Sequence, residues 1–327
     1  MAYVAKEDRF KGFARGWFLV AFSDELKPGD VQKMRYFGQE LVLFRTEEGD
    51  AHVLDAYCPH LGAHLGKGKV VGGSLECPFH AWRFNGEGEC TEIPYCEKIP
   101  KKAKTRAWRT DEVNGMIFVW HDPRGDTEPE YRIPVLEEYG TDAWLPWTTS
   151  ILTIKTHPKE IVENVVDKAH FGPVHNTHVH TFENEFVDHM GIQRAAGVAY
   201  PQGGGKDEFS INATYYGPAY QVSKMEGVLS SRLINAHTPI DEGSLHLRFA
   251  VSLKIIGDNT EKTEKFAQFY SNNLRDGFHE DIEIWENKLY RETPVLCAGD
   301  GPIIKLRSWY QQFFQPPEDD SAQDATP

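Results

Sequence analysis

The stretch CPHLGAHLGKGKVVGGSLECPFH, residues 58–80, contains two short segments that each pair a cysteine with a histidine. The first is CPH at residues 58–60, and the second is CPFH at residues 77–80, with sixteen residues between them. Cysteine thiolates and histidine imidazoles are both common metal ligands in proteins. Glycines at positions 66, 68, 72 and 73 permit the sharp turns that two adjacent loops need. The stretch therefore predicts a metal site carried by two loops.

Two kinds of site fit four such ligands. A zinc ion accepts two thiolates and two imidazoles, whereas a Rieske [2Fe-2S] cluster takes two thiolates on one iron and two imidazoles on the other. The glycine-rich flanks favour the cluster, because they allow backbone N–H groups to approach its sulfides. We expect Cys58, His60, Cys77 and His80 to be the cluster ligands, with zinc as the alternative. His64 belongs to neither of the two cysteine–histidine pairs, so we expect it to be a neighbour of the site or a surface residue.

Short β-type runs surround the two loops. Apolar and β-branched residues recur at 17–22, 31–37, 40–45, 52–56 and 115–120, with turn sequences at 27–30 and 47–50. The pattern predicts an all-β domain over residues 1–122, with the loops at the tips of hairpins. A segment rich in proline, glycine and acidic residues follows, and we expect a linker at 123–143.

A second candidate site begins at Glu163. On a helix from about Pro158 to Phe171, Glu163, Asp167 and His170 share one face, and apolar residues occupy the opposite face. Gly172 and Pro173 end this helix, so a turn brings His175 back toward the same place. The alternative is an amphipathic surface helix whose polar stripe is solvated.

The rest of the second domain, 144–314, shows strands and a long helix. We expect strands at 144–156, 209–215, 219–224, 227–237 and 245–255, the pattern of an antiparallel sheet. A helix is predicted from about residue 260 to 289. Asp281 lies on the apolar face of this helix, between Phe278 and Trp285. A carboxylate at such a place needs its negative charge compensated, and a metal would do so. Asp276, Glu280, Glu283 and Glu286 are competing candidates.

Two further segments carry predictions of their own. We expect His178 and His180 to lie in a loop after the short helix and not to be ligands, and Gln202–Gly205 to form a surface turn. The acidic, proline-containing residues 315–327 predict a disordered tail.

Composition excludes several functions. With 35 basic and 49 acidic residues, the net charge of −14 argues against nucleic acid or an anionic membrane as partner. No GxGxxG motif occurs, so we expect electrons to come from a separate reductase. The start of the chain lacks a signal peptide's apolar core, and no apolar run is long enough to span a bilayer. The five cysteines show no disulfide framework, which favours a cytoplasmic protein.

The order of the motifs resembles the oxygenase subunits of Rieske non-haem iron oxygenases: a Rieske-type pair is followed by Asp-x-x-His and a further His. Within that family the chain is most similar to the 3-ketosteroid 9α-hydroxylase branch. The similarity extends from residue 14 to 314 and rests on the segments 14–17, 54–58, 103–108, 118–123, 215–218, 233–235, 281–285 and 309–314. The sequence of residues 175–209 differs from that of this branch. The difference concerns the identity of the substrate.

The resemblance implies a fold, cofactors and roles. It implies an α+β chain in which a Rieske [2Fe-2S] domain precedes a helix-grip, START-like catalytic domain. A mononuclear Fe(II) would be bound by His170, His175 and Asp281, the last selected by the family pattern Asp-x-Glu-Ile-Trp. Asp167 would bridge the cluster of one subunit and the iron of its neighbour in a homotrimer. The position of Asp167 would then set the path of electrons between the two centres.

The resemblance also implies an activity. We expect a multicomponent monooxygenase that uses O2 and electrons from an NAD(P)H-dependent ferredoxin reductase to hydroxylate or desaturate a steroid-like substrate, in lipid degradation. The alternatives are a Rieske oxygenase of another specificity, such as an O- or N-demethylase, an aromatic-ring hydroxylase or a sterol desaturase. A non-enzymatic Rieske electron carrier is a third possibility, but it leaves about 200 residues without a role.

Overall fold

The computed structural model describes residues 10–200, 205–227, 229–257 and 260–314. The predicted disordered tail and most of the predicted turn at Gln202–Gly205 lie outside the described residues. No helix within the described ranges is long and apolar enough to cross a membrane.

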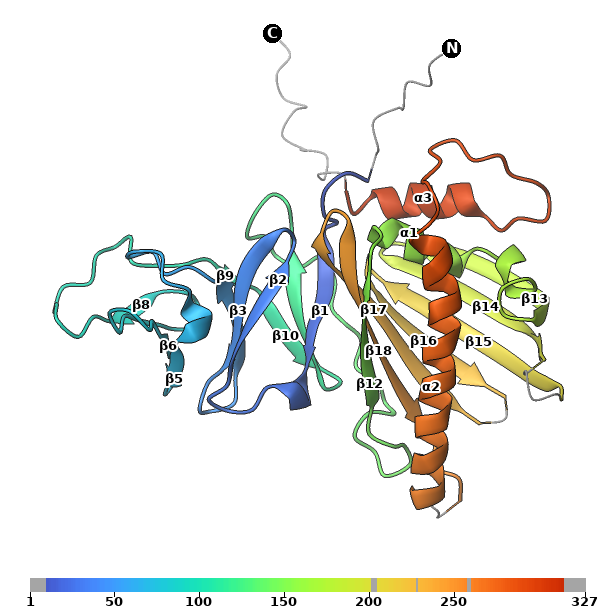
Figure 1. The fold of residues 1–327 in the computed structure, drawn as a ribbon, viewed down its shortest axis with the longest axis horizontal. Coiled ribbons are helices and arrows are strands. Elements are labelled where there is room, and N and C mark those ends of the chain that lie inside the picture. The colour runs from blue at the N-terminus through green and yellow to red at the C-terminus, as the bar shows by residue number, and fades with distance from the viewer. Residues whose placement is uncertain (1–9, 201–204, 228, 258–259, 315–327) are drawn as a thin grey trace, which may run out of the picture.

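The N-terminal part is built from three small antiparallel sheets, as the alternation of short apolar runs and turns predicts (Figure 1). One sheet has the order β1-β11-β10, the second β2-β3-β4-β9 and the third β5-β6-β7-β8. Their bounds are Gly16–Phe22 (β1), Val31–Tyr36 (β2), Gln39–Arg45 (β3), Ala51–Asp55 (β4), Lys69–Val71 (β5), Ser74–Glu76 (β6), Arg83–Phe84 (β7), Cys90–Glu92 (β8), Ala107–Trp108 (β9), Thr110–Val113 (β10) and Met116–His121 (β11). The strands predicted for this part are confirmed.

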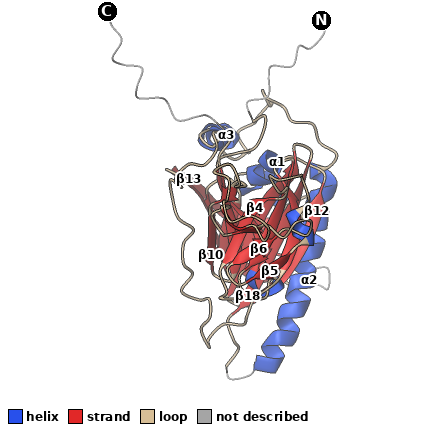
Figure 2. Ribbon diagram, turned by 90° about the vertical axis from the view of Figure 1, so that its left-hand side faces the viewer, coloured by secondary structure: helices blue, strands red, loops and turns tan. Residues whose placement is uncertain are grey.

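The C-terminal part is one seven-stranded antiparallel sheet with the order β12-β18-β17-β16-β15-β14-β13. Helix α2 lies across one face of this sheet (Figures 1 and 2). The bounds are Thr148–Ile154 (β12), Pro158–Val162 (α1), Thr177–Val187 (β13), Met190–Ala199 (β14), Asp207–Tyr216 (β15), Tyr220–Glu226 (β16), Ser231–Asp241 (β17), Ser244–Leu253 (β18), Thr260–Trp285 (α2) and Ile303–Gln311 (α3). An all-β part followed by an antiparallel sheet with helices confirms the predicted α+β class.

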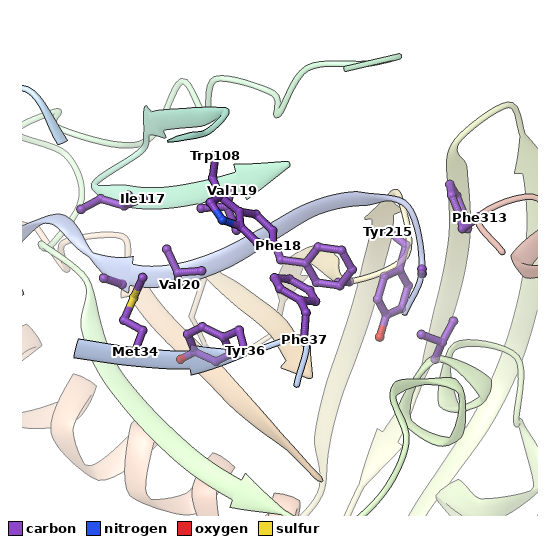
Figure 3. Packing of buried hydrophobic residues seen from close by; sticks show 14 of the residues in the cluster. Phe18, Val20, Met34, Tyr36, Phe37, Trp108, Ile117, Val119, Tyr215 and Phe313 are labelled. Atoms are coloured by element: carbon purple, nitrogen blue, oxygen red, sulfur yellow. The ribbon is translucent and has the colours of Figure 1, made fainter. Parts of the chain in front are cut away.

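The two parts share a continuous apolar core. Figure 3 shows Phe18, Phe37 and Trp108 of the N-terminal sheets packed in the same cluster as Tyr215 and Phe313 of the C-terminal part. Backbone hydrogen bonds reinforce this contact, because the N–H groups of residues 37 and 38 donate to the carbonyls of residues 239 and 240 at 2.9 Å. The two parts are therefore fixed relative to one another.

The segment predicted as a linker also enters a shared core. Tyr131, Ile133 and Leu136 are buried, and they pack with residues of β1 and β11 and with Tyr220 of β16. The Trp17 indole N–H donates to the carbonyl of Tyr131 at 2.9 Å. The connection therefore lies against both parts of the molecule.

The prediction of a loop around His178 and His180 was wrong. Both residues lie on β13, which pairs with β14 as a long hairpin. A β-bulge between Val179 and Thr181 shifts the register there. The bulge interrupts the two-residue alternation that identifies a strand in a sequence, so the signal was weak.

Candidate metal centres

The two cysteine–histidine segments lie on loops with the same backbone pattern. In the first loop, the N–H of Cys58 donates to the carbonyl of Ala63, and the N–H of Gly62 donates to the carbonyl of Cys58. In the second loop, the N–H of Cys77 donates to the carbonyl of Trp82, and the N–H of Ala81 donates to that of Cys77. The fourth residue after each cysteine has a left-handed backbone, with φ of 75° at Gly62 and 56° at Ala81. The loops are therefore a matched pair that can hold one group between them.

The four side chains gather between these loops. The ring centroids of His60 and His80 are 4.7 Å apart, and the ring of His60 stacks on Trp82 at 4.5 Å and 5°. The Trp82 indole N–H donates to the Tyr95 hydroxyl at 2.8 Å, which fixes the ring on which His60 rests. This packing orients the imidazole of His60 beside that of His80.

The donor atoms fit an iron–sulfur cluster. Cys58 and Cys77 are each only 3 % exposed, and burial raises the pKa of the Cys58 thiol to about 11, with Cys77 adding to the effect. A buried thiol becomes a thiolate when a metal compensates its charge. The Nδ1 atom of His80 is buried and has no hydrogen-bond partner among the described residues. A metal ligand bond would satisfy this atom, since buried polar nitrogens are otherwise paired.

The predicted helix from Pro158 to Phe171 is not continuous. Helix α1 ends at Val162, and short 3-10 turns follow at Glu163–Val165 and Ala169–Phe171. The Asp167 carboxylate accepts hydrogen bonds from the N–H groups of Ala169 at 3.1 Å and His170 at 3.3 Å. A side chain that caps these donors competes with the helical hydrogen bonds, so the helix breaks at this point.

Because of this break, Glu163 does not join Asp167 and His170. Its carboxylate accepts a hydrogen bond from the Arg307 guanidinium of α3, and the Lys288 ammonium lies 3.7 Å away. Arg307 is 6 % exposed and also donates to the carbonyl of Arg291 at 2.6 Å. Glu163 therefore connects the segment before the metal site to α3, and the prediction that it shares a face with the ligands was wrong.

Replacing Arg307 by alanine is expected to lower the free energy of unfolding by about 3 kcal/mol, because it leaves the Glu163 carboxylate, whose side chain is only 12 % exposed, without its main partner. The matched control is Arg194→Ala, which removes a half-exposed pair with Glu185 at 3.0 Å. That change should cost less than about 1 kcal/mol. Denaturant unfolding of both variants measures the difference, and equal losses would contradict the structural role of the buried pair.

The structure brings His170, His175 and Asp281 together. One ligand atom of each residue lies within 4.8 Å of the others. The Nε2 of His175 is 3.4 Å from the Oδ1 of Asp281, and the rings of the two histidines are 5.2 Å apart. Asp281 is 8 % exposed and comes from α2, whereas both histidines come from the broken segment before β13. Two imidazoles and one carboxylate that leave part of a metal's coordination sphere free are typical of non-haem Fe(II) sites.

A second carboxylate lies behind each histidine. The Nδ1 of His170 is buried 3.6 Å from the Oδ2 of Asp167, and the Nδ1 of His175 is 3.1 Å from the Oε2 of Glu280. Burial raises the pKa of Asp167, but His170 and the two N–H donors outweigh burial and hold that pKa below its usual value. Burial lowers the pKa of His175, but Asp281 and Glu280 outweigh this and raise it. Asp167 is therefore ionised at neutral pH.

The three residues border a cavity of about 460 Å³ between the sheet and α2. Most of its walls are apolar or aromatic, including Phe171, Phe209, Leu233, Phe266 and Trp285. Phe266 and Asp281 both line it, and they lie 15 residues apart on α2. At a rise of about 1.5 Å per residue, the cavity follows the helix for about 22 Å.

Sequence reasoning missed the polar groups of this cavity. Asn235 on β17 donates from Nδ2 to the Oε1 of Gln221 on β16 at 3.0 Å, and both line the cavity. The signal was present, because alternation along β17 places Asn235 on the same face as Leu233. The sequence does not show which face of the sheet meets α2. It therefore does not show which set of alternating residues lines the cavity.

Comparison with known proteins identifies both parts of the chain. The family described as "Rieske [2Fe-2S] domain" matches residues 16–103, and "3-Ketosteroid 9alpha-hydroxylase C-terminal domain" matches residues 119–314. The first match resolves the choice between zinc and an iron–sulfur cluster in favour of the cluster.

Full-length relatives agree with these matches. A Rhodococcus rhodochrous "3-ketosteroid-9-alpha-monooxygenase, oxygenase component" is 40% identical, with 94% of this chain and 83% of the relative covered. A Mycobacterium tuberculosis protein of the same description is 34% identical over 92% of this chain and 82% of its own. "Cholesterol 7-desaturase nvd 1" of Ciona intestinalis is 33% identical over 92% of this chain and 69% of its own.

Solved structures agree on the fold. The crystal structure of dicamba monooxygenase bound to dicamba has a TM-score of 0.76 and 20% identity, with 93% of this chain and 98% of that one covered. Together with the matched domains and relatives, these comparisons show that the chain belongs to the 3-ketosteroid 9α-monooxygenase oxygenase family of Rieske non-haem iron oxygenases, enzymes that use a [2Fe-2S] cluster and a mononuclear iron.

Proposed function

We propose that this chain is the oxygenase component of a multicomponent monooxygenase that hydroxylates a steroid or a similar rigid, apolar molecule. Electrons come from a separate NAD(P)H-dependent ferredoxin reductase, and O2 is the oxidant. The names of the relatives from Rhodococcus and Mycobacterium support this substrate class. We propose the cytoplasm as its compartment, because the five cysteines show no disulfide framework.

The cavity beside His170, His175 and Asp281 is the observation that carries the proposal. Its volume lies in the range of sites that enclose drug-sized ligands, and its apolar walls suit a hydrocarbon skeleton. Among the described lining residues there is no lysine or arginine, whereas Asp207, Glu208 and Glu226 contribute carboxylates. A neutral molecule is therefore favoured over an anion, which would leave its charge without a partner.

We assign the ligands as the sequence predicted them. Cys58, His60, Cys77 and His80 hold the cluster, and His170, His175 and Asp281 hold the mononuclear iron. When bound, that iron supplies a position at which O2 is activated, and the cluster supplies further electrons. The protein holds the three ligands beside the apolar cavity, so a substrate bound in the cavity lies next to them.

Asp167 is proposed as the residue that connects the two centres. Its Oδ2 faces the Nδ1 of His170, while 40 % of its side chain is exposed. An exposed carboxylate can accept a hydrogen bond from a second molecule, as a bridge to a neighbouring subunit's cluster histidine requires. We propose a homotrimer on this basis and on the family resemblance. We also propose the domain division 1–122, 123–143, 144–314 and 315–327.

An anaerobic single turnover tests the function. The purified protein is reduced chemically, mixed with a panel of 3-ketosteroids and sterols, and exposed to isotopically labelled O2, and products are read by mass spectrometry. One labelled oxygen atom in a steroid product is the expected result. Cluster reoxidation with every steroid returned unchanged would contradict the substrate class and favour a demethylase or an aromatic-ring hydroxylase.

Desaturation is a second candidate, because the Ciona intestinalis relative is named a cholesterol 7-desaturase. The same experiment separates the two reactions. A desaturated product has lost two hydrogen atoms and contains no labelled oxygen, whereas a hydroxylated product carries the label.

A further inference from the structure

The imidazole of His175 lies between two consecutive residues of α2. Its Nδ1 is 3.1 Å from the Oε2 of Glu280, and its Nε2 is 3.4 Å from the Oδ1 of Asp281. Consecutive residues on a helix point about 100° apart, so one turn of α2 reaches both nitrogens of the same ring. The position of His175 is thereby determined by α2 as well as by its own loop.

The contact with Glu280 fixes which nitrogen of His175 faces the metal. The oxygens of a carboxylate act as hydrogen-bond acceptors, so in this contact His175 donates its Nδ1–H to Glu280. A neutral imidazole with its proton on Nδ1 presents a free lone pair on Nε2. This is the nitrogen that faces Asp281, in the group formed with His170.

We infer that Glu280 is a positioning residue for the mononuclear iron, which orients His175 and increases the basicity of its Nε2. The inference rests on the ligand set assigned under the proposed function. A carboxylate that accepts the second N–H of a ligating histidine strengthens that ligand. The Oδ2 of Asp167 lies 3.6 Å from the Nδ1 of His170, a longer distance than the one between Glu280 and His175. Each of the two histidines therefore has a carboxylate of its own beside it.

The contrasting interpretation is an ordinary surface ion pair. Glu280 has 46 % of its side chain exposed, and exposed pairs contribute little to stability. The two interpretations differ in what they predict for metal binding. A surface pair has no effect on the affinity for iron, whereas a positioning residue changes that affinity without changing the fold.

The experiment measures Fe(II) affinity at the mononuclear site, without turnover. Protein that retains its cluster but has lost the mononuclear iron is titrated anaerobically with Fe(II) against a chromophoric chelator. We expect Glu280→Ala to bind Fe(II) about 10- to 100-fold more weakly than the native protein. Glu280→Gln should lie between the two, because its amide oxygen still accepts the Nδ1–H but carries no charge. The cluster absorption should be the same in all variants.

Glu283→Ala is the matched control. Glu283 is also exposed on α2, three residues further along, and it is not part of the group of metal-capable residues. Its removal takes away the same charge and should leave the affinity unchanged. If Glu280→Ala binds Fe(II) as tightly as Glu283→Ala, the positioning role is overturned. His175→Ala serves a separate purpose, because unchanged Fe(II) affinity in that variant would contradict the ligand set itself.

Discussion

Replacing Asp281 by alanine should remove the mononuclear iron and lower turnover by at least about 100-fold, while the cluster remains. Loss of a residue that contacts only a ligand already costs about 10- to 100-fold, and Asp281 is assigned as a direct ligand. The variant leaves two histidines, which carry no negative charge to compensate that of Fe(II). The iron content should fall by the mononuclear iron alone, and the visible absorption of the cluster should persist.

Asp276→Ala is the control for this change. Asp276 is exposed on the same helix, so its removal takes away the same side chain without affecting the group at the cavity. Iron analysis, visible absorption and steroid turnover are measured on both variants. A form of Asp281→Ala that keeps its iron and its activity would show that another residue completes the site.

Asp167→Asn should retain both metal centres but lower turnover by about 100-fold, because asparagine keeps the shape of the side chain and removes its charge. The Oδ1 of asparagine can still accept from the N–H groups of Ala169 and His170, so the break in the helix is preserved. What changes is the contact with the Nδ1 of His170 and the proposed contact with the neighbouring subunit. The step that slows should be electron transfer between the centres.

Stopped-flow measurement of cluster reoxidation, with substrate and O2 present, isolates that step. Asp241→Asn is the control, since the Asp241 carboxylate also accepts hydrogen bonds, from the N–H of Gly243 and the hydroxyl of Ser244, in a turn between β17 and β18. Its reoxidation rate should match that of the native protein. Full activity in Asp167→Asn would remove the bridge from the proposed electron path.

The sequence predicted most of the fold because many of its strands are runs of apolar, β-branched and aromatic residues that end in clear turns. The runs that became β1 to β4 and β15 to β18 are of this kind. The broken helix was not predicted, because helical periodicity describes which residues share a face and not whether a side chain caps the backbone. Asp167 was expected on a helical face, whereas it caps the N–H groups that follow.

The candidate site was predictable where ligand spacing is local. Helical periodicity placed Asp281 on the apolar face of its helix, and the family pattern selected it among its acidic neighbours. Glu280, in contrast, was considered only as a competitor of Asp281. Its role depends on the position of His175, which is 105 residues away in the chain. No periodicity relates two residues at that separation, so only the folded structure reveals their contact.

Helix α2 is shared by the wall of the cavity and the metal site. Phe266 and Tyr270 line the cavity in its first half, and Asp281 lies near its end. A hydrogen-bonded helix of 26 residues is about 39 Å long. The aromatic wall and one ligand of the metal therefore belong to the same backbone element, so the helix itself sets the spacing between them.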